Sequence, residues 1–278
     1  MKNIITRALS GAVYVALIVA SIMLLDNSPI AFIIVFSLFI MIGIKEIYDM
    51  SRNEATESWL VILIDMLGGI GLFMSFYLYA TATGASGTWF LPLAAYLLLR
   101  CIIQLYRPKQ NAVHSLERSF FSLLYVALPL GLLNCIVDVS APRILLAVFV
   151  FIWVNDTGAF LAGISMGKHR LFERISPKKS WEGFFGGLAA CIIVAWATYR
   201  WFNEFFQVPE LSTWIGLSIV VALAATFGDL TESLIKRTEG VKDSGNIIPG
   251  HGGILDRIDS LLLVSPAVLI YLALIVNN

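Results

Sequence analysis

Long runs of apolar residues dominate the chain and are separated by short polar segments. A helix needs about 20 mostly apolar residues to cross the hydrocarbon core of a bilayer. Runs of this kind, bounded by charged residues, proline or glycine, occur at residues 8–25, 29–44, 59–80, 89–105, 120–139, 144–164, 184–201, 213–235 and 254–276. The pattern therefore predicts an all-α, polytopic integral membrane protein with about nine transmembrane helices.

Composition agrees with this pattern and excludes a soluble protein. Hydrophobic residues make up 58% of the 278 residues and charged residues 14%, whereas soluble domains have about 45–50% and about 25%. The formal net charge is zero, so the sequence gives no indication of a nucleic-acid partner. The first apolar run exceeds the roughly 7–15 residues of a signal peptide, and we expect it to remain as the first transmembrane helix.

The charges in the loops predict an orientation. Of the 19 Lys and Arg residues, all but Arg143 and Arg200 lie in the N-terminal segment or in alternate loops on one side of the predicted membrane. Because Lys and Arg accumulate in cytoplasmic loops, this distribution predicts a cytoplasmic N-terminus and an outside C-terminus.

The two halves of the chain differ in their loops. Residues 1–140, with the first five predicted helices, have no recognisable motif and are typical of a scaffold. Residues 141–278, with helices six to nine, contain long polar loops at residues 165–183 and 236–253 on the predicted cytoplasmic side. We expect the catalytic site in this second half.

Ionisable residues inside the predicted helices are candidates for function. Each costs about 2.5–3.5 kcal/mol on insertion scales, and those that persist usually face a cavity. Asp156 lies in the sixth apolar run, Asp229 lies in the eighth, and Asp256 and Asp259 begin the ninth. Asp65 stands alone in the third run, and we expect it to serve packing or an interhelical hydrogen bond.

Helical spacing groups these acids further. One stripe of the eighth helix contains Asp229, Glu232, Ser233 and Lys236, and one face of the ninth contains Asp256 and Asp259. Carboxylates from two helix ends could hold Mg²⁺, which takes one or two carboxylates together with substrate phosphates. The spacing fits equally well with salt bridges from Asp229 to Lys236 and from Asp256 to Arg257, so both interpretations stay open.

The two long polar loops are basic and contain glycine or hydroxyl groups. Backbone N–H groups in such a loop can bind an anion, and lysines add charge for phosphates. The loop at residues 236–253 therefore predicts a phosphate site, although the G-x-G-x-x-G and P-loop motifs are absent. The loop at residues 174–183 fits either a phosphate site or a basic anchor at the membrane surface.

Residues 233–259 form a specific signature. It reads Ser233-Leu-Ile-Lys236-Arg237, then Lys242-Asp243-Ser-Gly245, then Ile248-Pro-Gly-His251-Gly-Gly-Ile-Leu-Asp256-Arg257-Ile-Asp259. In this segment, and in supporting segments at residues 155–158, 176–183 and 228–229, the chain resembles the phosphatidate cytidylyltransferases, also called CDP-diacylglycerol synthases. The resemblance implies nine transmembrane helices and the transfer of CMP from CTP to phosphatidic acid, with CDP-diacylglycerol and pyrophosphate as products.

The resemblance also implies Mg²⁺ dependence, with a second cation, K⁺ among the candidates, at the same site. The expected metal ligands are Asp229 and Asp256, with Asp156 as an additional candidate. The expected catalytic residues are Asp229, Asp256, Lys236 and Asp259. The expected substrate-binding residues are Ser176, Lys178, Lys179, Ser180, Ser233, Arg237, Lys242, Asp243, His251 and Arg257, with His251 as a hydrogen-bond donor or loop organiser rather than a base.

The expected partners are CTP, phosphatidic acid and membrane lipids, with no nucleic acid, and a homodimer is left open. By the resemblance, the expected location is a bacterial plasma (inner) membrane with the active site on the cytoplasmic side. One alternative is a CTP-dependent lipid kinase, which would release CDP instead of pyrophosphate. Another is an ion-coupled transporter in which Asp156, Asp229 and Asp256 form a cation path.

Overall fold

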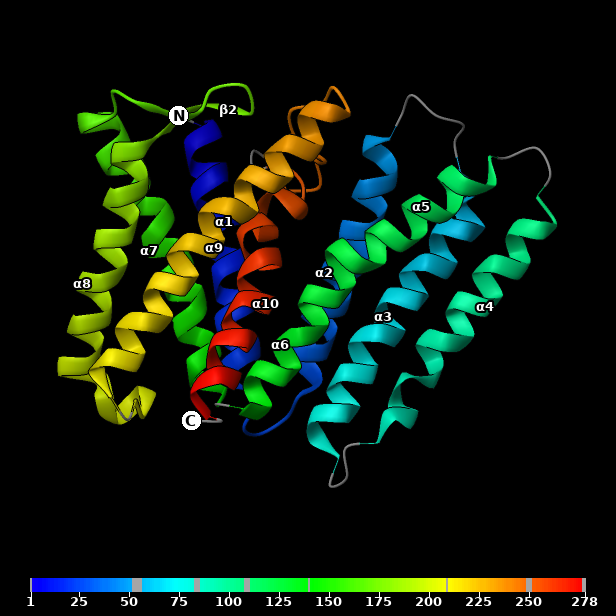
Figure 1. Ribbon diagram of the computed structural model, residues 1–278, viewed down its shortest axis with the longest axis horizontal. Coiled ribbons are helices and arrows are strands. Elements are labelled where there is room, and N and C mark those ends of the chain that lie inside the picture. Colours follow the sequence, from blue (N-terminus) through cyan, green and yellow to red (C-terminus); the bar gives the residue numbers. More distant parts are fainter. Residues whose placement is uncertain are drawn as a thin grey trace.

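The structure, a computed structural model, describes residues 2–51, 57–82, 86–107, 111–139, 141–208, 210–248 and 252–276. Its elements are α1 (Lys2–Met23), α2 (Ile30–Met50), α3 (Trp59–Thr81), η1 (Gly87–Phe90), α4 (Leu91–Leu105), α5 (Ala112–Ser122), η2 (Leu123–Ala127), α6 (Leu128–Val139), α7 (Pro142–Met166), β1 (Arg170–Phe172), β2 (Ser176–Ser180), α8 (Trp181–Phe206), α9 (Leu211–Thr238) and α10 (Leu255–Val276) (Figure 1). Across these described residues the fold is helical apart from one short β-hairpin, which confirms the predicted fold class.

The hydropathy pattern reappears as helices that can span a membrane. Among the described residues, eight helical segments are long and apolar enough to cross a bilayer, and a shorter apolar helix covers Leu9–Met23. Each of the nine predicted runs lies within one of these segments or overlaps it. Helices are the expected solution because the bilayer core offers no water to the backbone N–H and C=O groups.

The fifth predicted helix begins earlier than the sequence indicates. The π-helix η2 joins α5 to α6, so that one continuous helix begins at Ala112 instead of residue 120. Its first turns contain His114, Ser115 and Glu117. These polar side chains lower the mean hydropathy of the segment, so the apolar run in the sequence begins only after them. The start is fixed by Asn111, whose side chain accepts hydrogen bonds from the N–H groups of Val113 (3.1 Å) and His114 (3.4 Å).

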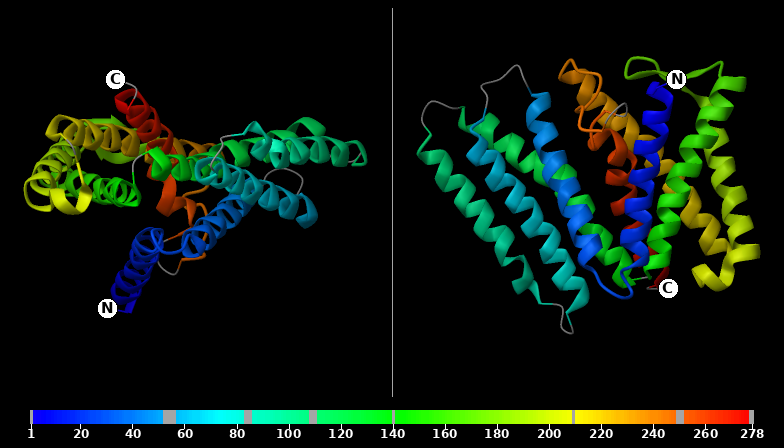
Figure 2. Two further views of the ribbon diagram at one scale, coloured as in Figure 1. Left: turned by 90° about the horizontal axis from the view of Figure 1, so that it is seen from below. Right: turned by 180° about the vertical axis from the view of Figure 1, so that it is seen from behind.

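The helices run between two ends of the molecule. The N-terminus, the β1–β2 hairpin and the α9–α10 connection lie at one end, and the C-terminus and the α8–α9 turn lie at the other (Figure 1). We call the first the hairpin end. The views in Figure 2 place α7, α8 and α9 on one side of the molecule and α3 and α4 on the other. Termini at opposite ends agree with the predicted topology, while the membrane side that each end faces stays a prediction.

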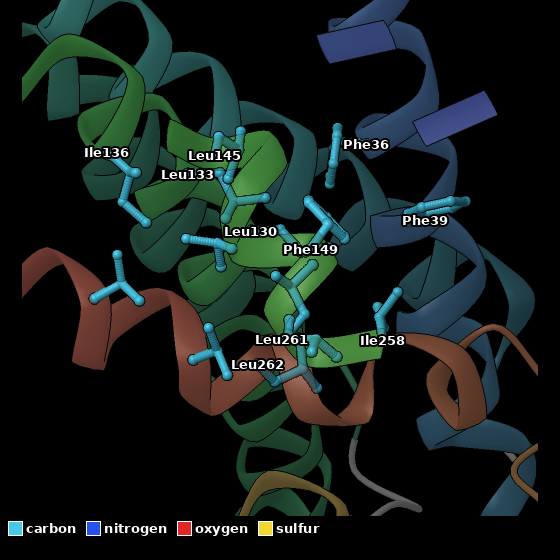
Figure 3. Close-up of a cluster of buried hydrophobic side chains, with 14 of the residues drawn as sticks. Phe36, Phe39, Leu130, Leu133, Ile136, Leu145, Phe149, Ile258, Leu261 and Leu262 are labelled. Atoms are coloured by element: carbon cyan, nitrogen blue, oxygen red, sulfur yellow. The ribbon is translucent and has the colours of Figure 1, made fainter. Parts of the chain in front are cut away.

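A buried apolar core joins the two halves of the chain. It contains Phe36 and Phe39 from α2, together with side chains of α6, α7 and α10, among them Leu130, Phe149 and Leu261 (Figure 3). The helix pairs that pack most extensively are α7 with α8 and α9 with α10. In the α7–α8 pair, a Cβ on Gly186 would lie 2.2 Å from the Cβ of Ala162, so only glycine allows this close approach. The division into residues 1–140 and 141–278 stays a prediction.

A buried polar cluster ties α2, α3, α4 and α5 together. Asp65 of α3 accepts hydrogen bonds from the hydroxyls of Tyr48 and Tyr96, the latter at 2.7 Å. The Nε atom of Arg100 lies 3.4 Å from the Asp65 carboxylate and donates to the Ser119 hydroxyl at 2.8 Å. The side chains of both Asp65 and Arg100 are 0% exposed. The expected interhelical role of Asp65 is therefore confirmed.

This cluster predicts a large effect of removing its only arginine. Replacing Arg100 by Met leaves the Asp65 carboxylate buried without its cation, and breaking a buried pair in this way costs about 3–5 kcal/mol. We expect Arg100→Met to lower the unfolding midpoint of detergent-solubilised protein markedly. Lys45→Met is the control, because it breaks the Lys45–Asp49 pair, whose side chains are half exposed, and such pairs contribute about 0–1 kcal/mol. Equal midpoints for the two variants would contradict the assignment.

Candidate active site

Four carboxylates from three helices line one cavity of about 410 Å³. They are Asp156 of α7, Asp229 of α9, and Asp256 and Asp259 of α10. Arg257, Tyr14 of α1 and Ile248 of the α9–α10 connection are among the other residues that line it. We call this space the acidic cavity. The predicted acids, which are up to 103 positions apart in the sequence, are thus brought together.

A second cavity, of about 260 Å³, lies against the β1–β2 hairpin. Lys178, Lys179 and Ser180 of β2 line it, and so do Asp156 and Asp229. We call it the hairpin cavity. Because Asp156 and Asp229 border both spaces, the two cavities are neighbours that share a wall of carboxylates.

The hairpin is fixed to the start of α8. Its strands pair antiparallel, with Arg170 opposite Ser180. The Ser180 hydroxyl accepts from the N–H of Gly183 at 3.1 Å and caps α8. The Glu182 carboxylate accepts from the N–H groups of Lys168 (3.1 Å) and His169 (3.2 Å), where the chain leaves α7. These contacts hold β2, and the lysines on it, at the edge of the site.

Lys179 connects the hairpin to α9. Its Nζ atom lies 2.7 Å from Oδ2 of Asp229 and donates to the backbone carbonyl of Thr226 at 3.3 Å. The other oxygen of Asp229, Oδ1, accepts from the Ser233 hydroxyl at 3.2 Å. Asp229 is thus ion-paired, with Lys179 instead of the Lys236 that helical spacing suggested.

Lys236 is buried and bridges two acids. Its Nζ atom donates to Oε2 of Glu232 at 2.9 Å and to Oδ1 of Asp256 at 2.6 Å. Glu232 is 0% exposed and Lys236 is 8% exposed. The Lys236–Asp256 contact therefore joins α9 to α10 in the interior of the protein. The partner of Asp256 is accordingly Lys236, not the neighbouring Arg257 that the salt-bridge alternative proposed.

The signature loop folds around Asp256. Its Oδ2 atom accepts from the N–H of Ser244 (3.0 Å), the hydroxyl of Ser244 (3.1 Å) and the N–H of Gly253 (2.8 Å). Both oxygens of Asp256 are therefore engaged, and the orientation of this carboxylate is set by four donors. The described part of the predicted phosphate loop, residues 236–248 and 252–253, thus contacts the first turn of α10 through Ser244 and Gly253.

The other predicted site residues lie around these cavities. Lys178, Arg237, Lys242, Asp243 and Arg257 have exposed side chains. Among the described residues, neither Lys178 nor Lys242 has an ion-pair partner, which leaves both ammonium groups available to an anion. Ser176 lies at the start of β2 and is partly buried. His251 lies outside the described residues, and the individual roles assigned from the resemblance stay predictions.

The first half of the chain contributes residues to the site that were not anticipated, most notably Tyr14 and Glu46. Tyr14 of α1 lines the acidic cavity, and its hydroxyl donates to the backbone carbonyl of Arg257 at 2.9 Å. Glu46 of α2 accepts from the N–H groups of Ile254 and Leu255, both at 2.9 Å. Glu46 could have been noticed as a charged residue two positions beyond the end of the second apolar run, whereas nothing in the sequence pattern singles out Tyr14.

Comparison with known proteins identifies the family. A model of the cytidylyltransferase family matches residues 5–275, which is nearly the whole chain. The chain belongs to the cytidylyltransferase family.

Relatives in this family come from several bacteria. A phosphatidate cytidylyltransferase of Staphylococcus aureus (strain COL) is 48% identical over 124 residues, which are 44% of this chain and 46% of the relative. The protein of that name from Haemophilus influenzae is 44% identical over 124 residues, 44% of this chain and 43% of the relative. The one from Staphylococcus epidermidis (strain ATCC 12228) is 46% identical over 126 residues, 45% and 46% of the two chains. The matched segment thus spans less than half the length of these relatives.

The donor chemistry of the acidic cavity fits a hard divalent cation in this cytidylyltransferase family member. Asp156 and Asp259 contribute carboxylates that have no ion-pair partner among the described residues, beside the paired Asp229 and Asp256. In the described part of the chain, no three His, Cys, Asp or Glu side chains already form a metal cage. Mg²⁺ does not need one, because it usually takes one or two carboxylates together with water and substrate phosphates.

The position of the hairpin is testable through Glu182. Its Ala variant loses the hydrogen bonds to the N–H groups of Lys168 and His169, and bonds to a charged acceptor contribute about 1.5–3 kcal/mol each. We expect amide exchange at residues 167–172 to rise roughly 10- to 100-fold in Glu182→Ala, as measured by hydrogen–deuterium exchange. Glu173→Ala, in the exposed turn of the same hairpin, is the control and should leave exchange unchanged; a rise there of the same size would refute the anchoring role.

Proposed function

We propose that this protein transfers CMP from CTP to phosphatidic acid, forming CDP-diacylglycerol and releasing pyrophosphate. The observation that carries the proposal is the acidic cavity, which shares Asp156 and Asp229 with a lysine-lined cavity toward one end of a membrane-spanning bundle. Membership of the cytidylyltransferase family and the names of the bacterial relatives support it. A CTP-dependent lipid kinase and an ion-coupled transporter receive no support from these comparisons.

The reaction is a displacement at phosphorus. A phosphate oxygen of phosphatidic acid attacks the α-phosphorus of CTP, and the bond from that phosphorus to the bridging oxygen of the β-phosphate breaks. Pyrophosphate leaves with the electron pair of that bond. A phosphate monoester is largely ionised near neutral pH because its second pKa is about 6, so the site needs no strong base. Positioning and neutralisation of charge supply most of the catalysis in such a transfer.

The acidic and the basic residues of the site would have different roles in this reaction. Asp229 and Asp256 would hold Mg²⁺, with Asp156 and Asp259 within the same cavity. When bound, the cation neutralises charge that develops toward the leaving group. Lys178 in the hairpin cavity and Lys242 on the α9–α10 connection offer exposed ammonium groups to phosphates. Lys236 holds Asp256 in place through its 2.6 Å contact. A second cation such as K⁺ and a homodimer stay predictions.

We further propose that the hairpin end faces the cytoplasm of a bacterial cell, at the plasma (inner) membrane. The concentration of Lys and Arg in the segments of that side supports this orientation through the positive-inside rule. CTP is a soluble anion, and a positively charged surface raises its local concentration near the lipid head groups. The two reactants would meet at the boundary between water and bilayer.

The function is tested by pyrophosphate release from purified protein in detergent with CTP, phosphatidic acid and Mg²⁺. We expect release only when all three are present, together with formation of CDP-diacylglycerol. Omitting each component in turn is the control, and replacing phosphatidic acid by diacylglycerol separates this reaction from a lipid kinase. Folded protein that releases no pyrophosphate with several phosphatidic acids would overturn the proposal.

The role of Asp229 predicts a large loss of turnover on a conservative change. Asp229→Asn keeps the volume of the side chain and removes its charge, and the cation contributes several kcal/mol of charge stabilisation in sites of this kind. We expect kcat to fall about 100-fold or more, measured at saturating CTP and lipid. Asp49→Asn, which removes an exposed acid of α2 outside both cavities, should retain the wild-type rate. A wild-type rate in Asp229→Asn would remove this carboxylate from the mechanism.

A further inference from the structure

We propose that Glu46, on α2 in the first half of the chain, is a positioning residue for the acidic cavity. Its carboxylate holds the first turn of α10 and, through Ser244, sets the orientation of Asp256. The proposal concerns a residue that lies outside the signature and outside both cavities. Its activity tests rest on the proposed function, whereas its structural test does not.

Three donors converge on the Glu46 carboxylate. Oε1 accepts from the N–H of Ile254 at 2.9 Å. Oε2 accepts from the N–H of Leu255 and from the hydroxyl of Ser244, both at 2.9 Å. The side chain is 1% exposed, so the protein has replaced its hydration shell with three fixed donors. Burying a carboxylate is costly unless hydrogen bonds replace those that it makes with water, and these three donors do so.

The position of Glu46 suits the start of a helix. α10 begins at Leu255, and the first N–H groups of a helix have no partners within the helix. Glu46 supplies acceptors to two of them, and its negative charge lies at the positive end of the helix dipole. A helix start inside the protein, where water is scarce, therefore obtains its cap from a different helix, 208 residues away in the sequence.

Ser244 transmits this contact to the site. Its hydroxyl lies 2.9 Å from Oε2 of Glu46 and 3.1 Å from Oδ2 of Asp256. A hydroxyl has one proton to donate, so the two carboxylates share a single donor and the position of one depends on the other. Gly253 lies next to both groups. A Cβ at this position would lie 2.1 Å from the Ser244 oxygen and 2.5 Å from both Glu46 oxygens, so a larger residue would disrupt this arrangement.

α2 is itself held firmly beside Glu46. Tyr48, two residues further along α2, donates to Asp65 and lies 3.1 Å from the Ser119 hydroxyl. The buried polar cluster of α3, α4 and α5 therefore fixes the turn of α2 from which Glu46 projects. Glu46 does not line either cavity. It therefore acts through Asp256 and the start of α10, and not by touching a substrate.

The test compares Glu46→Gln with Ser265→Ala. Gln has nearly the same volume as Glu but only one acceptor oxygen, so its amide NH₂ would face one of the N–H donors. Ser265 is a matched control. It lies on α10, is buried like Glu46, and donates to the carbonyl of Pro129 on α6 at 2.6 Å, and it has no hydrogen bond to the described residues of the α9–α10 connection.

The first readout is hydrogen–deuterium exchange of the Ile254 and Leu255 amides without substrate. We expect a rise of roughly 10- to 100-fold in Glu46→Gln, since hydrogen bonds to an ionised acceptor are about twice as strong as those to a neutral one, and no rise in Ser265→Ala. Unchanged exchange in Glu46→Gln would overturn the proposal. This result is independent of the reaction, so it stands even if the wild-type protein makes no CDP-diacylglycerol.

The second readout is turnover per folded protein, with the folded fraction taken from size-exclusion chromatography. We expect Glu46→Gln to lower kcat about 10- to 100-fold and to raise the Mg²⁺ concentration needed for half the maximal rate, as removal of outer partners of metal ligands does. Ser265→Ala should change neither quantity. Increased exchange with an unchanged kcat and Mg²⁺ dependence would mean that Glu46 only stabilises the fold, and would refute its positioning role.

Ser244→Ala keeps the proposal testable if Glu46→Gln does not fold. It removes the shared hydroxyl and nothing larger, and we expect it to lower kcat about 10-fold. Where both single variants fold, the double variant should be less impaired than the product of the two single losses, because both changes interrupt the same connection. A wild-type kcat in Ser244→Ala, or strictly multiplicative losses, would overturn the connection through Ser244.

Discussion

A charge inside a bilayer-spanning bundle must find a partner, and this requirement organises the structure. Arg100 and Asp65 satisfy one another at 0% exposure, together with two tyrosines and a serine from neighbouring helices. Lys236 similarly pairs with Oε2 of Glu232 on α9 and with Oδ1 of Asp256 on α10. The desolvation cost of each ion is several kcal/mol, so moving apart the helices that contribute to such a cluster would leave a buried charge without its partner. The acidic cavity departs from this rule, because it contains more carboxylates than the described cations neutralise, and this excess marks it as a functional site.

The first half of the chain helps to position the residues of the site in the second half. The apolar core is continuous from α2 through α6 and α7 to α10. At the hairpin end, polar contacts cross the same boundary, because Glu46 accepts from the start of α10 and Tyr14 donates to the carbonyl of Arg257. The position of Asp256 is therefore determined from both sides, by Lys236 within the second half and by the contacts that α2 makes with the signature loop. A site assembled in this way depends on the whole bundle being folded.

The sequence predicts the helices well because their physical cause is local. A run of apolar residues near 20 in length must be helical in a bilayer, and helical spacing correctly grouped Asp229 with Ser233 and Asp256 with Asp259. The polar beginning of α5 was not predicted, because mean hydropathy is low where a helix turn has polar side chains on one face. The ion-pair partners of Asp229 and Asp256 could not be predicted from spacing along one helix, since Asp229 pairs with Lys179 on the hairpin and Asp256 of α10 pairs with Lys236 of α9. Glu46 was assigned no role because its partners lie 208 and 209 residues away, and only the tertiary packing of α2 against α10 brings them together.

The incomplete metal cage has a consequence for the proposed reaction. A cavity with enough protein ligands to saturate Mg²⁺ would bind the ion in the absence of substrate and hold it tightly. Here no such set is preassembled among the described residues, and Lys179 and Lys236 already occupy one oxygen each of Asp229 and Asp256. Substrate phosphates would have to complete the coordination shell, since Mg²⁺ favours six oxygen ligands and retains several waters otherwise. Cation and nucleotide binding would then be linked, each raising the affinity for the other by the same factor. The contacts with Lys179 and Lys236 would hold these two carboxylates in a fixed orientation when neither the cation nor the nucleotide is bound.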